Sequence, residues 1–172
     1  MKKILVIVAL IAATCTAVNA ENTTRIGSVH RFDYGIFMGY SQGETAWHGM
    51  GFIDLNAANS NFRTRLSFGI AERPFLGGHG FNPNAGLELQ YLLRLADAFY
   101  LYPAVGGYFE HFSEQSGHSF VTNDFGLKAG AGIELQFSTG FGIFAEGTYM
   151  HMFKDPNKAN RLGGRVGVVM HF

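Results

Sequence analysis

The sequence has little cysteine and no long apolar run beyond its first residues. Cys15 is the only cysteine among 172 residues. It lies in residues 1–20, where the basic start MKK, the apolar run ILVIVALIAA and a small-residue end at Ala20 are typical of a secretory signal peptide. We expect cleavage after Ala20, which leaves residues 21–172 as a single domain. That domain would contain no thiol, so no disulfide framework could hold it together.

An excess of basic charge is also missing. All 13 Asp and Glu residues but only 11 of the 13 Lys and Arg residues follow Ala20, so the expected mature chain has a net charge near −2. This balance argues against nucleic acid as a partner, because nucleic-acid binding calls for a basic surface. After the predicted signal peptide there is no stretch of about 20 apolar residues, the length that a membrane-spanning helix needs.

Glycine and aromatic residues, by contrast, are abundant, with 23 Gly, 17 Phe and 7 Tyr. The clearest pattern is DFGLKAGAGIELQF, residues 124–137, in which every odd position is apolar and every even position is polar or glycine. Such period-two alternation predicts a β-strand. Similar alternation predicts further strands at residues 30–40, 62–71, 84–94, 99–112, 141–153 and 161–172. Residues 46–56 predict an eighth strand, although their pattern does not decide which face points inward.

The predicted connections between these strands alternate in length. The third, ERPFLGGHGFNP, and the fifth, EQSGHSFVTN, are each followed by a much shorter one, LADA and STG. An even number of strands with short turns at one end and longer loops at the other is typical of bacterial outer-membrane barrels. We therefore predict an all-β fold, an eight-stranded antiparallel up-and-down transmembrane β-barrel with short periplasmic turns and longer extracellular loops.

The charged residues share one face of the predicted strands, and large apolar residues form the other. A membrane barrel turns its apolar face to lipid and its polar face inward, which is the reverse of a soluble barrel. On this interpretation a nearly balanced interior charge network would consist of Arg31, Asp33, Arg63, Arg65, Glu88, Arg94, Glu110, Lys128, Glu134, Glu146 and Arg165. The alternative is that these residues form the solvated strand faces of a secreted sandwich.

The predicted signal peptide, the eight alternating strands and the terminal phenylalanine together resemble the small outer-membrane barrels of Gram-negative bacteria, the OmpA-type transmembrane domain and the OmpX/Ail group. The resemblance implies that the last strand carries a signal for the barrel assembly machinery. Arg165, Gly167, Met170 and Phe172 occupy the positions of that signal, with Met170 where an aromatic residue is more usual. It also implies an outer-membrane location, in contact with membrane lipids and lipopolysaccharide.

Some barrels of this kind remove an acyl chain from lipid A, and the resemblance implies that such an enzyme would carry a His-x-Ser pair. His151 stands where that histidine would fall, but Phe153 replaces the serine, so the nucleophile is missing. A second pair, His111 and Ser113, has spacing that places both side chains on one face of a strand, but it lies one hairpin too early. We therefore predict no catalytic residues, with a lipid-A-modifying hydrolase as the alternative.

The remaining candidates lie toward the loop end of the predicted barrel. Five histidines map there without the close spacing of metal ligands, so we predict no metal site and no cofactor. Exposed apolar side chains in the longer loops are candidates for contact with an extracellular partner. These are Phe75, Leu76, Phe81 and Phe120. Eight strands leave an interior just wide enough for side chains, so we expect a structural or surface-interaction protein, with a narrow channel as the second alternative.

Overall fold

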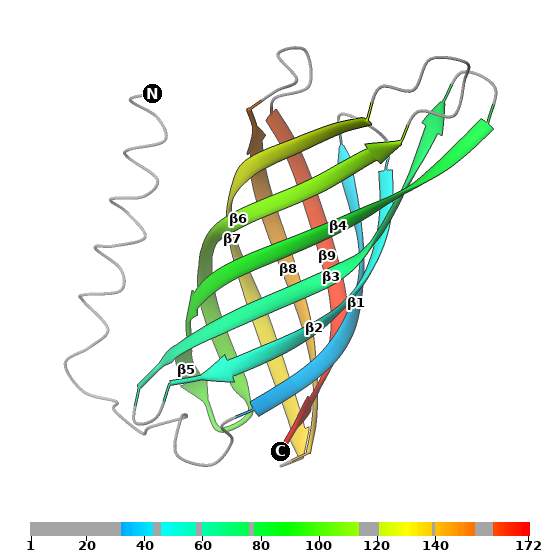
Figure 1. Ribbon diagram of the computed structural model, residues 1–172. Coiled ribbons are helices and arrows are strands. Elements are labelled where there is room, and N and C mark those ends of the chain that lie inside the picture. Colours follow the sequence, from blue (N-terminus) through cyan, green and yellow to red (C-terminus); the bar gives the residue numbers. More distant parts are fainter. Residues whose placement is uncertain are drawn as a thin grey trace.

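The computed structural model describes residues 32–42, 46–57, 60–75, 78–113, 121–138, 140–153 and 160–172. The predicted signal peptide and Arg31 lie outside these ranges. Nine strands are present in them (Figure 1). The strands are β1 (Phe32–Gln42), β2 (Ala46–Asn56), β3 (Phe62–Phe75), β4 (Gly78–Tyr91), β5 (Leu93–Ala96), β6 (Phe99–Ser113), β7 (Val121–Ser138), β8 (Phe141–Met152) and β9 (Asn160–His171). In the described residues, no helix is long and apolar enough to cross a membrane.

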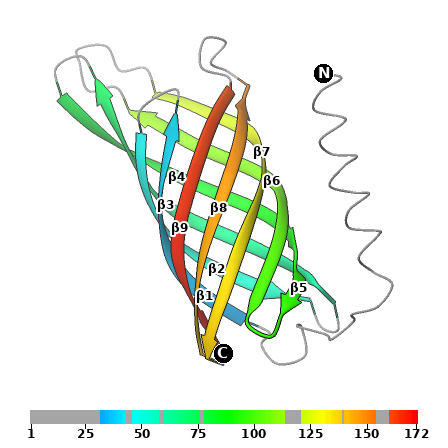
Figure 2. The ribbon, with the colours of Figure 1, turned by 180° about the vertical axis from the view of Figure 1, so that it is seen from behind.

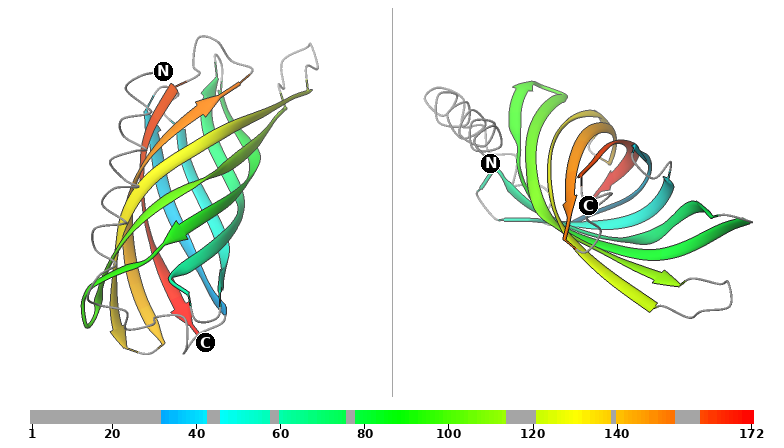
Figure 3. Two further views of the ribbon diagram at one scale, coloured as in Figure 1. Left: turned by 90° about the vertical axis from the view of Figure 1, so that its left-hand side faces the viewer. Right: turned by 90° about the horizontal axis from the view of Figure 1, so that it is seen from above.

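The strands form a closed antiparallel ring. Successive strands pair from β1 to β4 and from β6 to β9, β1 also pairs with β9, and both β4 and β5 pair with β6. β4 and β5 therefore make one barrel strand that is interrupted at Leu92, and the barrel has the eight strands that the sequence predicts. Figure 2 shows β1 beside β9 where the ring closes, and the view from above in Figure 3 shows how the strands curve around the interior.

Alternation places two different surfaces on the two faces of each strand. Outward-facing apolar side chains are strongly exposed to the surroundings, including Ile36, Met38, Phe68, Leu127, Leu162 and Val166, each at least 60% exposed. Inward-facing positions carry most of the buried charge instead. This distribution is that of a barrel whose exterior meets lipid and whose interior is polar. It excludes the secreted sandwich, in which the apolar faces would be buried.

Aromatic pairs mark the two ends of the apolar belt. Tyr40 and Trp47 lie against each other at the end where β1 meets β2, with ring centroids 5.2 Å apart. At the opposite end Tyr34 stacks on Phe172 at 5.0 Å, and Phe137 stacks on Phe141 at 5.9 Å. Aromatic girdles at both membrane interfaces are a regular feature of transmembrane barrels.

The third connection differs from the long loop that the sequence predicts. β3 continues to Phe75 and β4 begins at Gly78, and the two strands are paired throughout, with Glu72 opposite Phe81 and Phe75 opposite Gly78. β2 pairs with β3 only as far as Glu72, and β6 pairs with β4 only as far as Asn84. Residues 72–75 and 78–83 therefore belong mainly to a two-stranded extension, here called the projecting hairpin, which reaches beyond the neighbouring strands in Figure 1.

Candidate functional site

The barrel interior brings together nine of the eleven charged residues that the sequence places there. Each of the nine is at most 8% exposed. They are Asp33, Arg63, Arg65, Glu88, Glu110, Lys128, Glu134, Glu146 and Arg165. They come from β1, β3, β4, β6, β7, β8 and β9, so contacts among them cross the interior.

Glu88 on β4 is the centre of the first cluster. Its carboxylate accepts hydrogen bonds from Lys128 Nζ at 2.7 Å and from Arg165 Nη1 at 2.9 Å. Arg165 also reaches Glu146 on the neighbouring strand, with Nη2 at 2.6 Å from Oε2. Its guanidinium lies 4.6 Å from the centroid of the Phe37 ring. Two carboxylates and two cations therefore neutralise one another in this cluster.

Arg65 on β3 anchors the second cluster. It donates two parallel hydrogen bonds to Asp54, both 2.7 Å long, and its guanidinium lies 3.9 Å from the Phe52 ring centroid and 4.6 Å from that of Phe144. Such a bidentate pair fixes both position and orientation. The fully buried side chain of Arg65 is thus held by charge on one side and by aromatic rings on two others.

Arg63, also on β3, connects the Arg65–Asp54 pair to polar side chains of β4 and β7. It donates to Gln90 Oε1 and Glu134 Oε2, each at 2.7 Å, and lies 3.4 Å from Asp54. Together the two central clusters contain four cations and four carboxylates, all buried. Because an unpaired charge in a dry interior costs several kcal/mol, this match is what a closed lumen requires.

The central interior is filled as well as neutral. A cavity of about 10 Å³ lies among Met50, Glu88, Lys128 and Arg165, roughly the space of one water molecule. Tyr102, fully buried, adds an aromatic side chain that lies under the Arg63 guanidinium at 5.2 Å. Among the described residues, these side chains therefore occupy most of the interior at this level.

Two of the predicted network residues stand apart. Arg31 lies outside the described residues, and Arg94 does not join the buried network. Arg94 is on the inward side of β5, opposite the buried Tyr100, but it lies at the barrel end beside the turn to β6, where its side chain is 29% exposed. Its Nη2 donates to Asp97, which is fully exposed, at 2.8 Å.

The interior also contains polar residues that the sequence analysis did not select. They include Asp54, Asn82, Asn84, Gln90, Asp124, Arg161 and His171. Asp54 was missed because apolar residues occur on both faces of β2: Met50 and Phe52 are buried, while Ile53 and Leu55 are exposed. His171 Nδ1 lies 3.1 Å from Asp33 Oδ1, and Asn56 Nδ2 donates to Asp33 Oδ2 at 2.7 Å. Asp54 lies directly opposite Arg65 on the neighbouring strand. A search for residues of opposite charge at such paired positions would have identified the charged residues that alternation missed.

The candidate hydrolase residues lie toward the end of the barrel with the projecting hairpin. His151 is exposed, contacts Asn160 Oδ1 through Nδ1 at 2.9 Å, and packs edge-on against Phe153. His111 contacts the amide oxygen of Asn123 on the neighbouring strand at 2.7 Å. Both histidines thus have an asparagine amide oxygen as neighbour.

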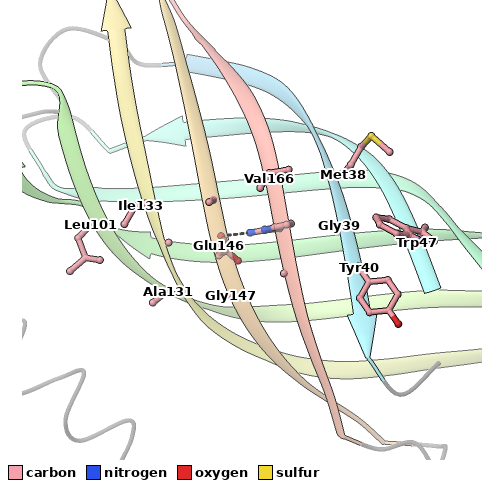
Figure 4. A pocket seen from close by; sticks show the side chains of 14 residues that line it. Met38, Gly39, Tyr40, Trp47, Leu101, Ala131, Ile133, Glu146, Gly147 and Val166 are labelled. Atoms are coloured by element: carbon pink, nitrogen blue, oxygen red, sulfur yellow. Dashed lines mark hydrogen bonds and ion pairs between the residues drawn. The ribbon is translucent and has the colours of Figure 1, made fainter. Parts of the chain in front are cut away.

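A shallow groove crosses the apolar outer surface of β6, β7, β8, β9 and β1. It has a volume of about 690 Å³, and its floor contains the small residues Ala131, Gly147 and Gly164. Figure 4 shows Leu101 and Ile133 near one edge and Tyr40 and Trp47 near the other. Because its lining is almost entirely apolar, the groove is part of the belt that faces acyl chains and does not resemble a polar substrate site.

The residues of the predicted assembly signal lie on both faces of β9 and at its end. Arg165 points inward, whereas Met170 and Phe172 are exposed on the outer surface. Gly167 allows the close approach of Phe144, whose ring carbon would lie 2.7 Å from an added Cβ. Of the predicted contact residues, Phe81 is exposed on β4 and Phe75 lies on β3, whereas Leu76 and Phe120 lie outside the described residues.

The fold, the apolar belt and the buried charges define an integral outer-membrane β-barrel protein. No protein-family model and no curated protein sequence matches the chain. Solved structures, however, have the same fold. The N-terminal β-barrel domain of Pseudomonas aeruginosa OprF is 13% identical, with a TM-score of 0.58, covering 81% of this chain and 97% of that domain.

Two further barrels are similar to the same extent. Ail, the attachment invasion locus protein of Yersinia pestis, is 17% identical with a TM-score of 0.56, covering 82% of this chain and 96% of Ail. Neisserial surface protein A is 12% identical with a TM-score of 0.61, and the coverage is 82% and 96%. The chain therefore has the architecture of the small eight-stranded outer-membrane barrels over nearly the whole of their length.

Proposed function

We propose that this protein is a non-enzymatic barrel of the outer membrane whose role is to present a surface for contact with other molecules. The observation that carries this proposal is the projecting hairpin, two paired strands that extend past their neighbours above the two charge-balanced clusters of the central interior. A lumen closed by ion pairs favours a structural or binding role over transport. His111 and His151 each contact an asparagine amide oxygen, which likewise favours a role other than hydrolysis.

The composition of the hairpin tip indicates the chemistry of its partner. Residues 73–80, RPFLGGHG, include one arginine, one histidine and two large apolar residues but no acidic residue. Such a segment suits an anionic surface. The similar barrel Ail has been crystallised in complex with the heparin analogue sucrose octasulfate, which supports sulfated polysaccharide as the first class of partner to test.

Removing the hairpin tip is expected to reduce surface binding without unfolding the barrel. Glu72 and Phe81 are opposite each other, so an Asn-Gly turn can replace residues 73–80 and close the shortened hairpin. We expect cells that produce this variant to bind several-fold less to immobilised heparin than cells with the unaltered protein. Phe141→Ala, which removes an exposed aromatic ring at the opposite end, is the matched control.

Unchanged heparin binding and an unchanged envelope phenotype after removal of the tip would contradict the role assigned to the hairpin. Two measurements separate the rival functions. A changed lipid A acylation pattern in His111→Ala, measured by mass spectrometry, would favour a hydrolase. Discrete conductance steps in planar bilayers would favour a channel.

The C-terminal strand is proposed to carry the signal for the assembly machinery in Arg165, Gly167, Met170 and Phe172, with the chain termini in the periplasm. Deletion of Phe172 is expected to lower outer-membrane levels strongly. It should change the stability of an already folded barrel only slightly, because one stacked pair contributes about 0.5–1.5 kcal/mol. Tyr34→Ala removes the same stack but keeps the terminal residue, so we expect normal membrane levels. Normal levels of the truncated protein in membrane fractions would disprove the signal.

A further inference from the structure

The groove on the outer surface of the barrel has a floor of small residues. Ala131, Gly147 and Gly164 lie in one row across β7, β8 and β9, because each is directly opposite the next. The row continues into Tyr40 on β1 and Trp47 on β2, which stand at one edge of the groove in Figure 4. An aromatic wall therefore stands beside a floor that has almost no side-chain atoms.

Packing within the barrel does not explain the two glycines of this floor. A Cβ added to Gly147 would meet no atom of the described residues within 4 Å, and one added to Gly164 would lie 3.8 Å from the Glu146 carbonyl oxygen, an ordinary contact. At the inward Gly106, by contrast, an added Cβ would lie less than 3 Å from backbone atoms of β4. Glycine inside a strand weakens it and often marks a place where a ligand approaches the backbone closely. The two open glycines therefore point to an occupant on the outside of the barrel.

The groove also extends along the strands. A second apolar depression, of about 470 Å³, adjoins it on the side of the chain termini. The two depressions share four lining residues, which are Met38, Ile133, Ala145 and Val166. Together they form a narrow apolar path over β7, β8, β9 and β1 that is suited to a long, thin apolar group.

A polar cluster lies on β8 and β9 at the extracellular end of this path. Tyr149 is the next outward residue on β8 after Gly147, about 7 Å further along the strand. Its hydroxyl donates to Asn160 Oδ1 at 2.6 Å, and His151 Nδ1 lies 2.9 Å from the same oxygen. His151 and Asn160 are exposed and Tyr149 is half-buried. The outer surface of β8 therefore changes from an apolar groove to hydrogen-bonding groups within one step along the strand.

We propose that this groove holds one acyl chain of a lipid of the outer leaflet, with the ester end of that lipid against Tyr149, His151 and Asn160. The order of the two surfaces, apolar path and then polar cluster, matches the order of chain and headgroup in such a lipid. In a membrane, burial of apolar surface gives no hydrophobic gain, so close packing against small residues is what holds a partner in place. This lipid site is independent of the projecting hairpin and of the surface-contact role proposed above.

A second copy of the barrel fits this surface less well than a lipid does. A twofold dimer brings the same patch of both subunits together, so two concave grooves would face each other and leave a space between them. A single acyl chain can enter the groove from the membrane, which already surrounds the exposed apolar side chains on both sides of it, such as Met38 and Ile133.

Native mass spectrometry of the protein, extracted from outer membranes in a mild detergent, tests the site. We expect a species that is heavier than the protein by one lipid. Gly147→Leu/Gly164→Leu fills the floor of the groove and should reduce this species several-fold. Ala131→Leu narrows the same floor from β7 and should also reduce it. Asn160→Ala leaves the groove open but removes the oxygen that Tyr149 and His151 contact, so we expect weaker retention of the lipid here too.

Gly107→Leu is the matched control. Gly107 also lies on the outward side of its strand, β6, and an added Cβ has its nearest neighbour, the Gly126 carbonyl oxygen, 3.9 Å away. It is not among the residues that line the groove. We therefore expect Gly107→Leu to retain lipid as the unaltered protein does. Heat-modifiability gels show whether each variant is folded, and Ala131→Leu decides the question if the double glycine variant does not fold.

Trp47 at the edge of the groove reports the same site in a bilayer. In vesicles that contain phosphatidylcholine brominated on one acyl chain, its fluorescence should be quenched less in Gly147→Leu/Gly164→Leu than in Gly107→Leu. The proposal is wrong if the groove variants and Gly107→Leu retain lipid equally. It is also wrong if the extracted protein is a dimer that Gly147→Leu/Gly164→Leu abolishes, because a second copy then occupies the groove.

Discussion

Gly106→Ala is expected to lower the free energy of unfolding by about 3 kcal/mol or more, the upper range for overpacking. Gly106 faces inward on β6, opposite Glu88 of β4 and Lys128 of β7. An added Cβ would collide with the carbonyl oxygen of Leu87 and lie 2.8 Å from the Glu88 Cα atom. Because backbone atoms cannot rotate away, β4 and β6 would have to move apart and disturb the central charge cluster.

Gly147→Ala is the matched control on the lipid-facing side. An added Cβ at Gly147 has no atom within 4 Å, so the methyl group would enter the outer groove without touching the protein. We expect its stability to change by less than about 1 kcal/mol, in the stabilising direction, because alanine restricts the unfolded chain more than glycine does. Urea titrations followed by the fluorescence of Trp47, the single tryptophan, measure both variants. If both variants lose the same stability, close packing inside the barrel is not the reason that glycine is needed at position 106.

Asp54→Leu is expected to destabilise the barrel by about 3–5 kcal/mol, because it leaves a buried charge without its partner. Arg65 would lose both of its hydrogen bonds to a carboxylate, and Arg63 would lose a neighbouring negative charge 3.4 Å away. The same urea titration measures the effect.

The double variant Asp54→Leu/Arg65→Met tests the cause of that loss. Replacement of a whole buried ion pair by apolar residues of similar size is often neutral or stabilising. Phe52 and Phe144, which now enclose the guanidinium, would pack against the methionine side chain instead. We expect most of the lost stability to return. If the double variant is as unstable as Asp54→Leu, the Asp54–Arg65 pair is needed for the packing of the interior and not only for charge balance.

The fold could be predicted because lipid and lumen impose opposite polarity on alternate residues. β7 shows this most clearly: Phe125, Leu127 and Ile133 are exposed outward, while Lys128 and Glu134 are buried. Where both faces of a strand carry large apolar residues, as in β2, the alternation no longer decides the orientation. The inward position of Asp54 therefore required the strand pairing with β3.

The position of a residue along the barrel axis was harder to predict than the face of the strand on which it lies. Arg94 has the inward position that alternation assigns to it. It lies at a barrel end, however, where it pairs with the fully exposed Asp97 and not with a buried carboxylate. The projecting hairpin was hidden for a related reason. Its glycines and proline are typical of a loop, and nothing in RPFLGGHG itself shows that β3 and β4 continue to pair beyond the last contacts with β2 and β6.

Each strand has one face toward lipid and one face toward the lumen, and this affects how the sequences of such barrels diverge. Positions such as Ile36, Leu127 and Val166 face lipid and need only remain apolar, so many different residues satisfy them. Inward positions are constrained by specific partners, but a charge pair can be exchanged for another pair elsewhere in the lumen. Two barrels can therefore keep one architecture at 12–17% identity. For proteins of this shape, kinship would be traced better through the placement of inward charges than through the fraction of identical residues.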